Sequence, residues 1–228
     1  MTYQHVQQIA RDTIAYARTI LHPGMQLTEV RKACEEKMLA LGADSFWYWD
    51  VGAFVFSGDE TAVSVSGRTY QTSDRLLDEN DIVTIDLSPQ VGDTWGDYAR
   101  TIVLQDGHVV CKEDIRHPEW RSGLAMEDAL HAQLLACARP DMTFEELHRV
   151  MNASIVAGGF VNLDFSGNLG HSIVRKKGDR IYIEPGNTAR LGDVERFTFE
   201  PHIARPGSCY GVKKENIYYF DGGKLKVL

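Results

Sequence analysis

The sequence predicts an α+β fold built from two similar halves, because the order of two helices followed by strands occurs twice. A short repeat supports this. Pro23-Gly24-Met25 before one predicted helix resembles Pro140-Asp141-Met142, which lies 117 residues further on, and the same spacing carries Gly42 onto Gly159. Proline and methionine before a helix are also a common start signal, but agreement at both helix ends favours a repeat. We therefore expect one domain over residues 1–228, with pseudo-repeat halves of approximately 1–115 and 116–228.

The first half begins with two predicted helices. Apolar residues recur every three or four positions from Tyr3 to Leu21, and His22-Pro23-Gly24 ends this helix. A second helix follows and ends at Gly42. Segments of apolar and β-branched residues then predict strands, and Ser88–Gly96 has the composition of a turn. The expected strands are Ala53–Phe56, Ala62–Val65, Ile82–Leu87 and Tyr98–Leu104.

The second half repeats this order. Met126, Leu130 and Leu134 share one face of a predicted helix that ends before Pro140. Thr143 and Glu146 form a capping box for the next helix, which ends at Gly158-Gly159. The strands expected after it are Ile181–Ile183, Arg196–Phe199, Tyr210–Lys214 and Ile217–Phe220.

Composition excludes several classes of protein. The formal net charge is −8 and no basic segment occurs, so we expect no nucleic-acid partner. No apolar segment has the length of a membrane span, and no secretory signal precedes the first helix. The four cysteines are scattered without a Cys-x-x-Cys pair, which favours reduced thiols over a disulfide or zinc framework. A cytoplasmic location is the resulting expectation.

Four carboxylates and one histidine form the strongest chemical pattern. Asp86 and Asp97 belong to predicted strands of the first half, and Glu200 and Glu215 follow at nearly the repeat spacing. His171 comes directly after the glycine-rich segment 167–170. Two facing strand pairs would bring the four carboxylates together. Oxygen ligands with one imidazole suit a pair of divalent ions, because bridging carboxylates offset the repulsion between the ions.

A single aspartate or glutamate on a strand usually faces solvent, so each residue alone is weak evidence. Asp86, however, follows Ile82-Val83-Thr84-Ile85, and Glu200 follows Phe197-Thr198-Phe199. These apolar settings predict burial, and a buried carboxylate without a partner costs several kcal/mol. The five residues together therefore favour a metal site.

These residues also carry a family resemblance. Ile85-Asp86-Leu87 with Asp97-Tyr98-Ala99-Arg100-Thr101, Gly170-His171, Phe199-Glu200-Pro201 and Gly211-Val212-Lys213-Lys214-Glu215-Asn216 resemble, in order, the ligand segments of the pita-bread metallopeptidases. That superfamily includes methionine aminopeptidase, aminopeptidase P, prolidase and the non-peptidase creatinase. The resemblance covers essentially the whole chain and corresponds to the catalytic domain alone. It implies a pita-bread fold, in which helices back a curved, mainly antiparallel sheet.

The resemblance implies a site and a reaction. Asp86 and Asp97 would bind one divalent ion, His171 and Glu200 the other, and Asp97 and Glu215 would bridge them. Manganese, iron, cobalt and zinc all suit this ligand set. The enzyme would be a dinuclear metal-dependent hydrolase of a short peptide or amide bond, like prolidase or an aminopeptidase, with Glu200 moving a proton.

The sequence departs from the family at two histidines that lie near the scissile bond of its peptidases. The segment 57–66 contains no histidine, and Ile183 stands where the other is expected, before Glu184-Pro185. His202 could replace one of them as a catalytic residue, or be a surface or supporting histidine. Arg175-Lys176-Lys177 could bind an anionic substrate group or form a solvated loop.

Three functions therefore remain open. The first is the peptidase or amidase, acting on a small peptide or amino-acid-like substrate. The alternative is a non-peptidase metalloenzyme of the same fold, a lyase or a hydrolase of a modified amino acid. A binding protein without catalysis is disfavoured, because all five ligands are present. The oligomeric state is open: the family often forms dimers, and Phe46–Trp49 is the candidate contact of a homodimer. Trp47, Trp49 and Trp95 would otherwise line a pocket or the core.

Overall fold

The computed structural model describes residues 2–228 and confirms the four predicted helices. Their bounds are α1, Tyr3–Ile20; α2, Leu27–Ala40; α3, Pro118–Cys137; and α4, Phe144–Ala157. The capping box of α4 is present, because the Thr143 hydroxyl accepts a hydrogen bond from the Glu146 amide and the Glu146 carboxylate accepts one from the Thr143 amide. No helix within residues 2–228 combines the length and the apolar character that crossing a bilayer requires.

The strands form small antiparallel sheets in each half. In the first half the order is β2-β3-β6-β7, with bounds Ala53–Ser57, Asp81–Leu87, Tyr98–Gln105 and His108–Val109. A second sheet joins β1 (Ser45–Phe46), β4 (Pro89–Val91) and β5 (Thr94–Trp95). In the second half the orders are β13-β12-β9 (Lys224–Val227, Asn216–Asp221, Phe197–Phe199) and β11-β10-β8 (Gly211–Lys213, His202–Ala204, Val161–Asn162).

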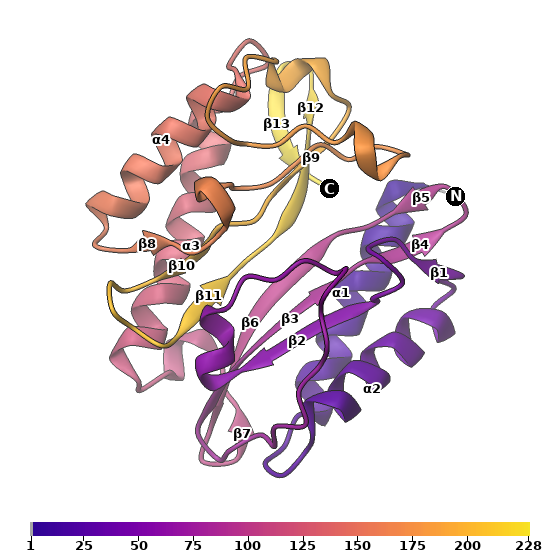
Figure 1. Cartoon of the computed structure of the whole chain (residues 1–228), viewed down its shortest axis with the longest axis vertical. Helices are drawn as coiled ribbons and strands as arrows, with labels where there is room; N and C mark the ends of the chain where they lie inside the picture. Colours follow the sequence, from indigo (N-terminus) through magenta and orange to yellow (C-terminus); the bar gives the residue numbers. More distant parts are fainter. Residues whose placement is uncertain (1) are drawn as a thin grey trace.

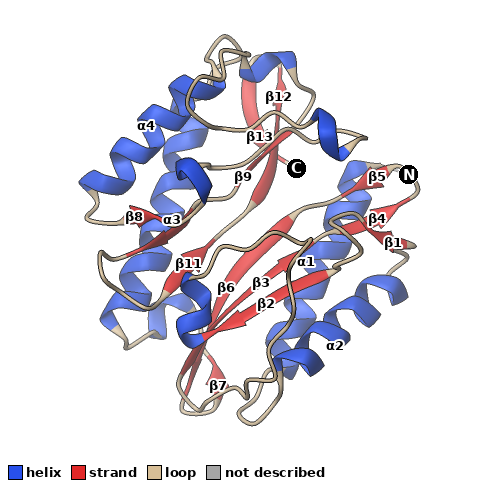
Figure 2. Cartoon of the chain, viewed as in Figure 1, coloured by secondary structure: helices blue, strands red, loops and turns tan. Residues whose placement is uncertain are grey.

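The strands lie in the middle of the molecule, between the helix pair α1–α2 and the helix pair α3–α4 (Figures 1 and 2). One core cluster contains apolar residues of α1, α2, β2, β3 and β6, and another contains those of α3, α4, β9 and β12. Each helix pair thus covers mainly the strands of its own half, although Ile82 of β3 and Val103 of β6 belong to the cluster around α3 and α4. The assignment to one domain stays a prediction.

The two halves are joined where β6 lies beside β11 and β12. The Thr101 hydroxyl accepts a hydrogen bond from the Lys213 amide (2.9 Å) and donates one to the Lys213 carbonyl (3.1 Å). The Glu215 amide donates to the Ala99 carbonyl at 3.0 Å, and the Arg100 guanidinium donates to the Glu215 carbonyl at 2.6 Å. This junction places the strand ends that carry the predicted ligands next to each other.

Two local strand predictions were wrong. Ala62–Val65 is not a strand: Gly58–Ala62 forms a 3₁₀ turn, and Val63 and Val65 remain half-exposed because no neighbouring strand pairs with them. Ile181–Ile183 forms only an isolated bridge between Tyr182 and His171. The expected turn 88–96 contains the short hairpin of β4 and β5, which β1 completes. These short segments depend on partners distant in the chain, which local periodicity does not reveal.

Two neighbouring leucines of α3 test the packing of the second core. Leu134 is 0% exposed and Leu135 is 43% exposed. We predict that Leu134→Ala lowers the free energy of unfolding by about 2–5 kcal/mol, because it removes buried methyl groups and leaves a cavity. Leu135→Ala should change it by less than about 0.5 kcal/mol. Urea denaturation followed by circular dichroism measures both values, and equal losses would contradict this packing.

Candidate metal centre

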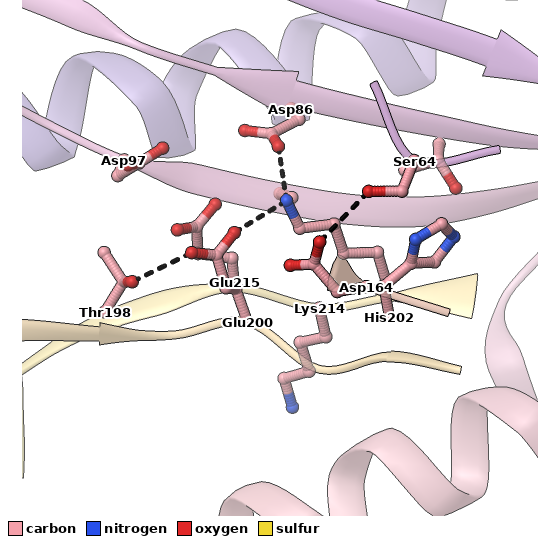
Figure 3. Close-up of polar contacts among 12 residues, drawn as sticks. Ser64, Asp86, Asp97, Asp164, Thr198, Glu200, His202, Lys214 and Glu215 are labelled. Carbon is pink, nitrogen blue, oxygen red and sulfur yellow. Dashed lines mark hydrogen bonds and ion pairs between the residues drawn. The ribbon is translucent and has the colours of Figure 1, made fainter. Parts of the chain in front are cut away.

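The predicted carboxylates come from equivalent places in the two halves. Asp86 lies near the end of β3 and Asp97 just before β6, and these strands pair with Asp86 opposite Ala99. Glu200 follows β9 and Glu215 precedes β12, one step beyond the Phe199–Asn216 pair. Figure 3 shows Asp86 and Asp97 on one side, pointing toward Glu200 and Glu215 on the other. We call Asp86, Asp97, Glu200 and Glu215 the carboxylate cluster.

The structure brings the cluster and His171 together. Oxygens of Asp86, Glu200 and Glu215 lie within 4.8 Å of one another. The His171 Nε2 atom lies 3.7 Å from Asp97 Oδ2 and 3.7 Å from Glu200 Oε1. Two atoms that bind the same ion at 2.0–2.2 Å are about 3–4 Å apart. The five side chains therefore have the spacing of ligands to divalent ions after small side-chain movements.

The surroundings of His171 fix the ring in the form that binds metal. Its Nδ1–H donates to the Ser172 carbonyl at 3.1 Å, so that Nε2 carries the lone pair facing Asp97 and Glu200. The His171 amide donates to the Thr198 hydroxyl, which in turn donates to Glu200 Oε1 at 3.2 Å (Figure 3). Gly170 precedes His171 with φ +138°, and a Cβ at this position would overlap the Thr198 carbonyl oxygen. Glycine is therefore required for this close approach.

Burial makes the carboxylate cluster electrostatically unfavourable by itself. Glu215 is 0% exposed, and neither of its side-chain oxygens accepts a hydrogen bond. Burial and the charges of Asp97, Glu200 and Asp86 raise the pKa of Glu215 well above its ordinary value, and burial with Asp86 and Glu200 does the same for the pKa of Asp97. Buried, unpartnered carboxylates indicate a site that binds cations. The donor set thus fits divalent metal ions.

A cavity of about 350 Å³ opens onto this cluster. Residues of both halves line it, including Asp86, Asp97, His171 and Glu200. His202 lines it as well. The His202 Nε2–H donates to the Thr61 carbonyl at 2.6 Å, and burial lowers the pKa of His202 to about 4, so that the ring is neutral. The five expected ligands and His202 are therefore all at one site.

Sequence reasoning missed three charged residues of the cavity. Lys213 bridges two carboxylates of the cluster, with Nζ 2.6 Å from Asp86 Oδ2 and 2.8 Å from Glu200 Oε2. Arg180 lines the cavity, with its guanidinium 5.0–5.4 Å from the ring centres of Trp47, Tyr48 and Tyr182. Asp164 lines it too and accepts a hydrogen bond from the Ser64 hydroxyl (Figure 3). Lys213 belongs to the segment Gly211–Asn216, which resembles a ligand segment of the family. A lysine on a strand usually faces solvent, so the sequence alone did not single it out.

The structure also places the segment Arg175-Lys176-Lys177, which was open between an anion site and a solvated loop, and the tryptophans. Arg175 and Lys176 are exposed, and Lys177 lies over the Trp47 and Trp49 rings. Trp47 and Trp95 are buried and stacked, with ring centres 3.6 Å apart, and both lie about 6 Å from the His171 ring. Trp47 and Trp95 therefore pack beside the candidate metal centre.

Comparison with known proteins identifies the family. Residues 2–221 match the model of metallopeptidase family M24. The chain belongs to this family. A methionine aminopeptidase of Helicobacter pylori is 30% identical over 209 residues, which cover 87% of this chain and 76% of that protein.

Solved structures of an aminopeptidase and a prolidase resemble the fold closely. An X-Pro aminopeptidase from Thermotoga maritima superposes with a TM-score of 0.80 and 19% identity, over 97% of this chain and 58% of that one. A prolidase from Pyrococcus horikoshii superposes with a TM-score of 0.77 and 20% identity, over 97% of this chain and 59% of that one. The chain thus spans a little over half the length of these two structures. The predicted pita-bread fold is confirmed.

A variant at Glu215 tests the electrostatic cost of the site. The ordinary pKa of a glutamate, which holds in the unfolded chain, is about 4.3. Because the pKa of folded Glu215 is raised, the folded protein binds a proton that the unfolded chain has lost, and the free energy of unfolding falls as the pH rises above about 4.3. Glutamine does not ionise, so Glu215→Gln removes this loss of stability. With a chelator present, we predict that Glu215→Gln raises the free energy of unfolding at pH 8 by about 1–3 kcal/mol, and by less at pH 5.

Urea denaturation at the two pH values measures this difference. Glu195→Gln is the control, because the Glu195 side chain is 85% exposed and its substitution should have little effect at either pH. A Glu215→Gln protein that is no more stable than the wild type at pH 8 would contradict the raised pKa of Glu215.

Proposed function

We propose that the chain is a dinuclear metal-dependent hydrolase that cleaves a short peptide or amide bond. The observation that carries this proposal is the convergence of Asp86, Asp97, His171, Glu200 and Glu215 at the end of one cavity. Membership of metallopeptidase family M24 supports it. These five residues would hold two divalent ions (manganese, iron, cobalt or zinc), with Asp97 and Glu215 shared. Bound divalent ions supply Lewis acidity, which activates water and polarises a carbonyl group.

Glu200 is the residue we propose to move the proton. It lines the cavity, and the Thr198 hydroxyl holds its Oε1 atom in place. Burial alone would raise the pKa of Glu200, but the Lys213 ammonium outweighs burial and lowers this pKa below its ordinary value, so that the carboxylate is ionised and can accept a proton from water. Neutral His202, tied to Thr61 through Nε2, presents Nδ1 as an acceptor and would orient the substrate or assist this transfer.

The rest of the cavity wall carries charges that suit a small substrate with charged groups. Arg180 and Asp164 line the same cavity outside the ligand set and carry opposite charges. No carboxylate among residues 2–228 forms an ion pair with Arg180. The Arg180 Nε–H donates to the Lys177 carbonyl at 3.1 Å, but a guanidinium that is paired with no protein carboxylate is suited to a substrate carboxylate, and Asp164 to a substrate ammonium group. A short peptide with free ends, or an amino-acid derivative, would match both charges.

One observation favours the alternative of a non-peptidase metalloenzyme with this fold, a lyase or a hydrolase of a modified amino acid. Among the described residues that line the cavity, the only histidines are His171 and His202. One auxiliary histidine of the family's peptidases is expected in the segment 57–66, which contains the 3₁₀ turn Gly58–Ala62, and the other is expected at buried Ile183. Proton transfer near the scissile bond would then differ from that of those peptidases.

A substrate panel tests the proposed activity. With manganese, iron, cobalt or zinc supplied, we expect turnover of Xaa-Pro dipeptides or of Met-Ala peptides, abolished by a chelator. We expect His171→Ala to lose at least about 100-fold in kcat/KM, because it removes the only imidazole ligand. His5→Ala is the control, because His5 is exposed and distant in sequence from the five expected ligands. A protein that binds metal stoichiometrically but cleaves no peptide would reject the peptidase and leave the alternative.

Arg180 gives a separate prediction about the substrate. Arg180→Met should raise KM about 10- to 100-fold for a dipeptide with a free carboxylate, because one charge-assisted hydrogen-bonding group is lost. KM for the same dipeptide amide should change little. Arg175→Met, at an exposed position of the same segment, is the matched control. Equal effects on the acid and the amide would exclude Arg180 as the carboxylate site.

The candidate homodimer, the absence of a nucleic-acid partner and the cytoplasmic location stay predictions. The candidate dimer contact is partly accounted for within the chain, because Trp47 is 4% exposed, whereas Trp49 is 36% exposed.

A further inference from the structure

Trp49 is held beside the cavity by a strained turn. Tyr48 lines the cavity, and its carbonyl accepts a hydrogen bond from the Val51 amide at 3.2 Å, which closes a turn with Trp49 and Asp50 at its centre. Both central residues have positive φ, +60° and +59°. Such a turn normally takes glycine, asparagine or aspartate, and a bulky residue with positive φ is strained. Because strain of this kind concentrates at functional sites, it points to a function for the Trp49 ring, which is 36% exposed.

Three basic side chains gather on Trp49 and on its neighbour Trp47. Arg68 Cζ lies 4.2 Å and Lys177 Nζ 4.8 Å from the centre of the Trp49 ring. Lys177 Nζ and Arg180 Cζ lie 5.5 Å and 5.0 Å from the centre of the Trp47 ring. Lys177 is thus shared by the two rings. The three residues Arg68, Lys177 and Arg180 form one positive patch, which we call the basic rim.

The main chain fixes the members of the basic rim. Lys177–Asp179 is a 3₁₀ turn, and the Arg180 Nε–H donates to the Lys177 carbonyl at 3.1 Å. Side chains three positions apart in such a turn lie above one another, so Lys177 and Arg180 project from the same side. Arg68 comes from the first half of the chain. The preceding Gly67 is buried, and a Cβ at this position would lie 2.7 Å from the Tyr48 ring, so this segment lies directly against the strained turn.

The basic rim has no acidic partner. Within residues 2–228, none of its three members forms an ion pair with a carboxylate, and neither do the neighbouring acids Asp50 and Asp179. The chain has a formal net charge of −8, so acidic side chains to pair with these cations are not in short supply. Neighbouring like charges without counter-ions repel one another. The arrangement therefore favours the binding of an anion.

We propose that the basic rim binds a second negative charge of the substrate, next to the carboxylate that Arg180 would bind. Arg180 lines the cavity, whereas Arg68 and Lys177 lie outside its lining. They would therefore meet a group that extends beyond the carboxylate held by Arg180. The substrate class is an amide whose leaving amine is a dicarboxylate, such as a dipeptide that ends in aspartate or glutamate. This inference rests on the proposed function and narrows its substrate.

The strength of this preference follows from the exposure of the patch. Arg68 is exposed and Lys177 is half-buried, so solvent and salt screen part of their attraction for a carboxylate. Two such ion pairs together are expected to favour an acidic leaving amine over its neutral amide analogue by about tenfold.

A fluorescence titration tests this inference without turnover. Because Arg68 and Lys177 both lie against Trp49, tryptophan fluorescence should report an anion that binds between them. With manganese supplied, the wild type is titrated with glutamate and with glutamine, two leaving amines that differ only in the second negative charge. We expect glutamate to bind about tenfold more tightly, and this ratio to fall at high ionic strength.

Variants of the basic rim should lower the ratio of the two affinities. Lys177→Met and Arg68→Met should each reduce it to about threefold or less, because each removes one cation. Lys176→Met is the matched control: Lys176 is the exposed neighbour of Lys177 and lies over no aromatic ring within residues 2–228. Its ratio should equal that of the wild type. The dipeptide Met-Glu should also be hydrolysed with a higher kcat/KM than Met-Gln.

Equal binding of glutamate and glutamine by the wild type would overturn the basic rim as an anion site. An unchanged ratio in both folded variants would do the same, and the wild-type titration decides alone if neither variant folds. The proposed hydrolase fails separately. If no peptide is cleaved, Met-Glu included, but glutamate still binds more tightly than glutamine, the peptidase is rejected and the anion site stands.

Discussion

Repulsion among four buried carboxylates is the constraint on which the centre of this structure depends. Asp97 and Glu215 have raised pKa values because each is buried beside other acids. A chain selected for stability alone would replace them with neutral residues, since buried charges without partners cost free energy. The surrounding elements instead keep the carboxylates close together despite their repulsion. Strand pairs fix the positions of the carboxylates, and the core clusters of the two halves support those strands.

The repeat explains how one chain builds such a site. Each half supplies two carboxylates from one pair of strands, and the junction between Thr101 and Lys213 sets the halves side by side. His171 breaks the symmetry, because it comes from only the second half and faces Asp97 and Glu200. Two ions held by this cluster would therefore have different ligands.

The sequence was sufficient for the helices, the main strands and the convergence of Asp86, Asp97, His171, Glu200 and Glu215. Those features follow from long periodic segments and from short motifs repeated at a fixed spacing. It was insufficient where partners distant in the chain decide the outcome. Val63 and Val65 alternate like a strand but have no strand beside them, and Lys213 and Arg180 gain their meaning only from the carboxylates and aromatic rings around them.

The attachment of Glu215 to the first half has a consequence for the order of assembly. The Glu215 main chain is fixed by bonds to Ala99 and Arg100 of the first half. Each half folded by itself would present only its own pair of carboxylates. The full set of Asp86, Asp97, His171, Glu200 and Glu215 therefore comes together only when the two halves dock, and a cation that needs ligands from both halves would bind after docking.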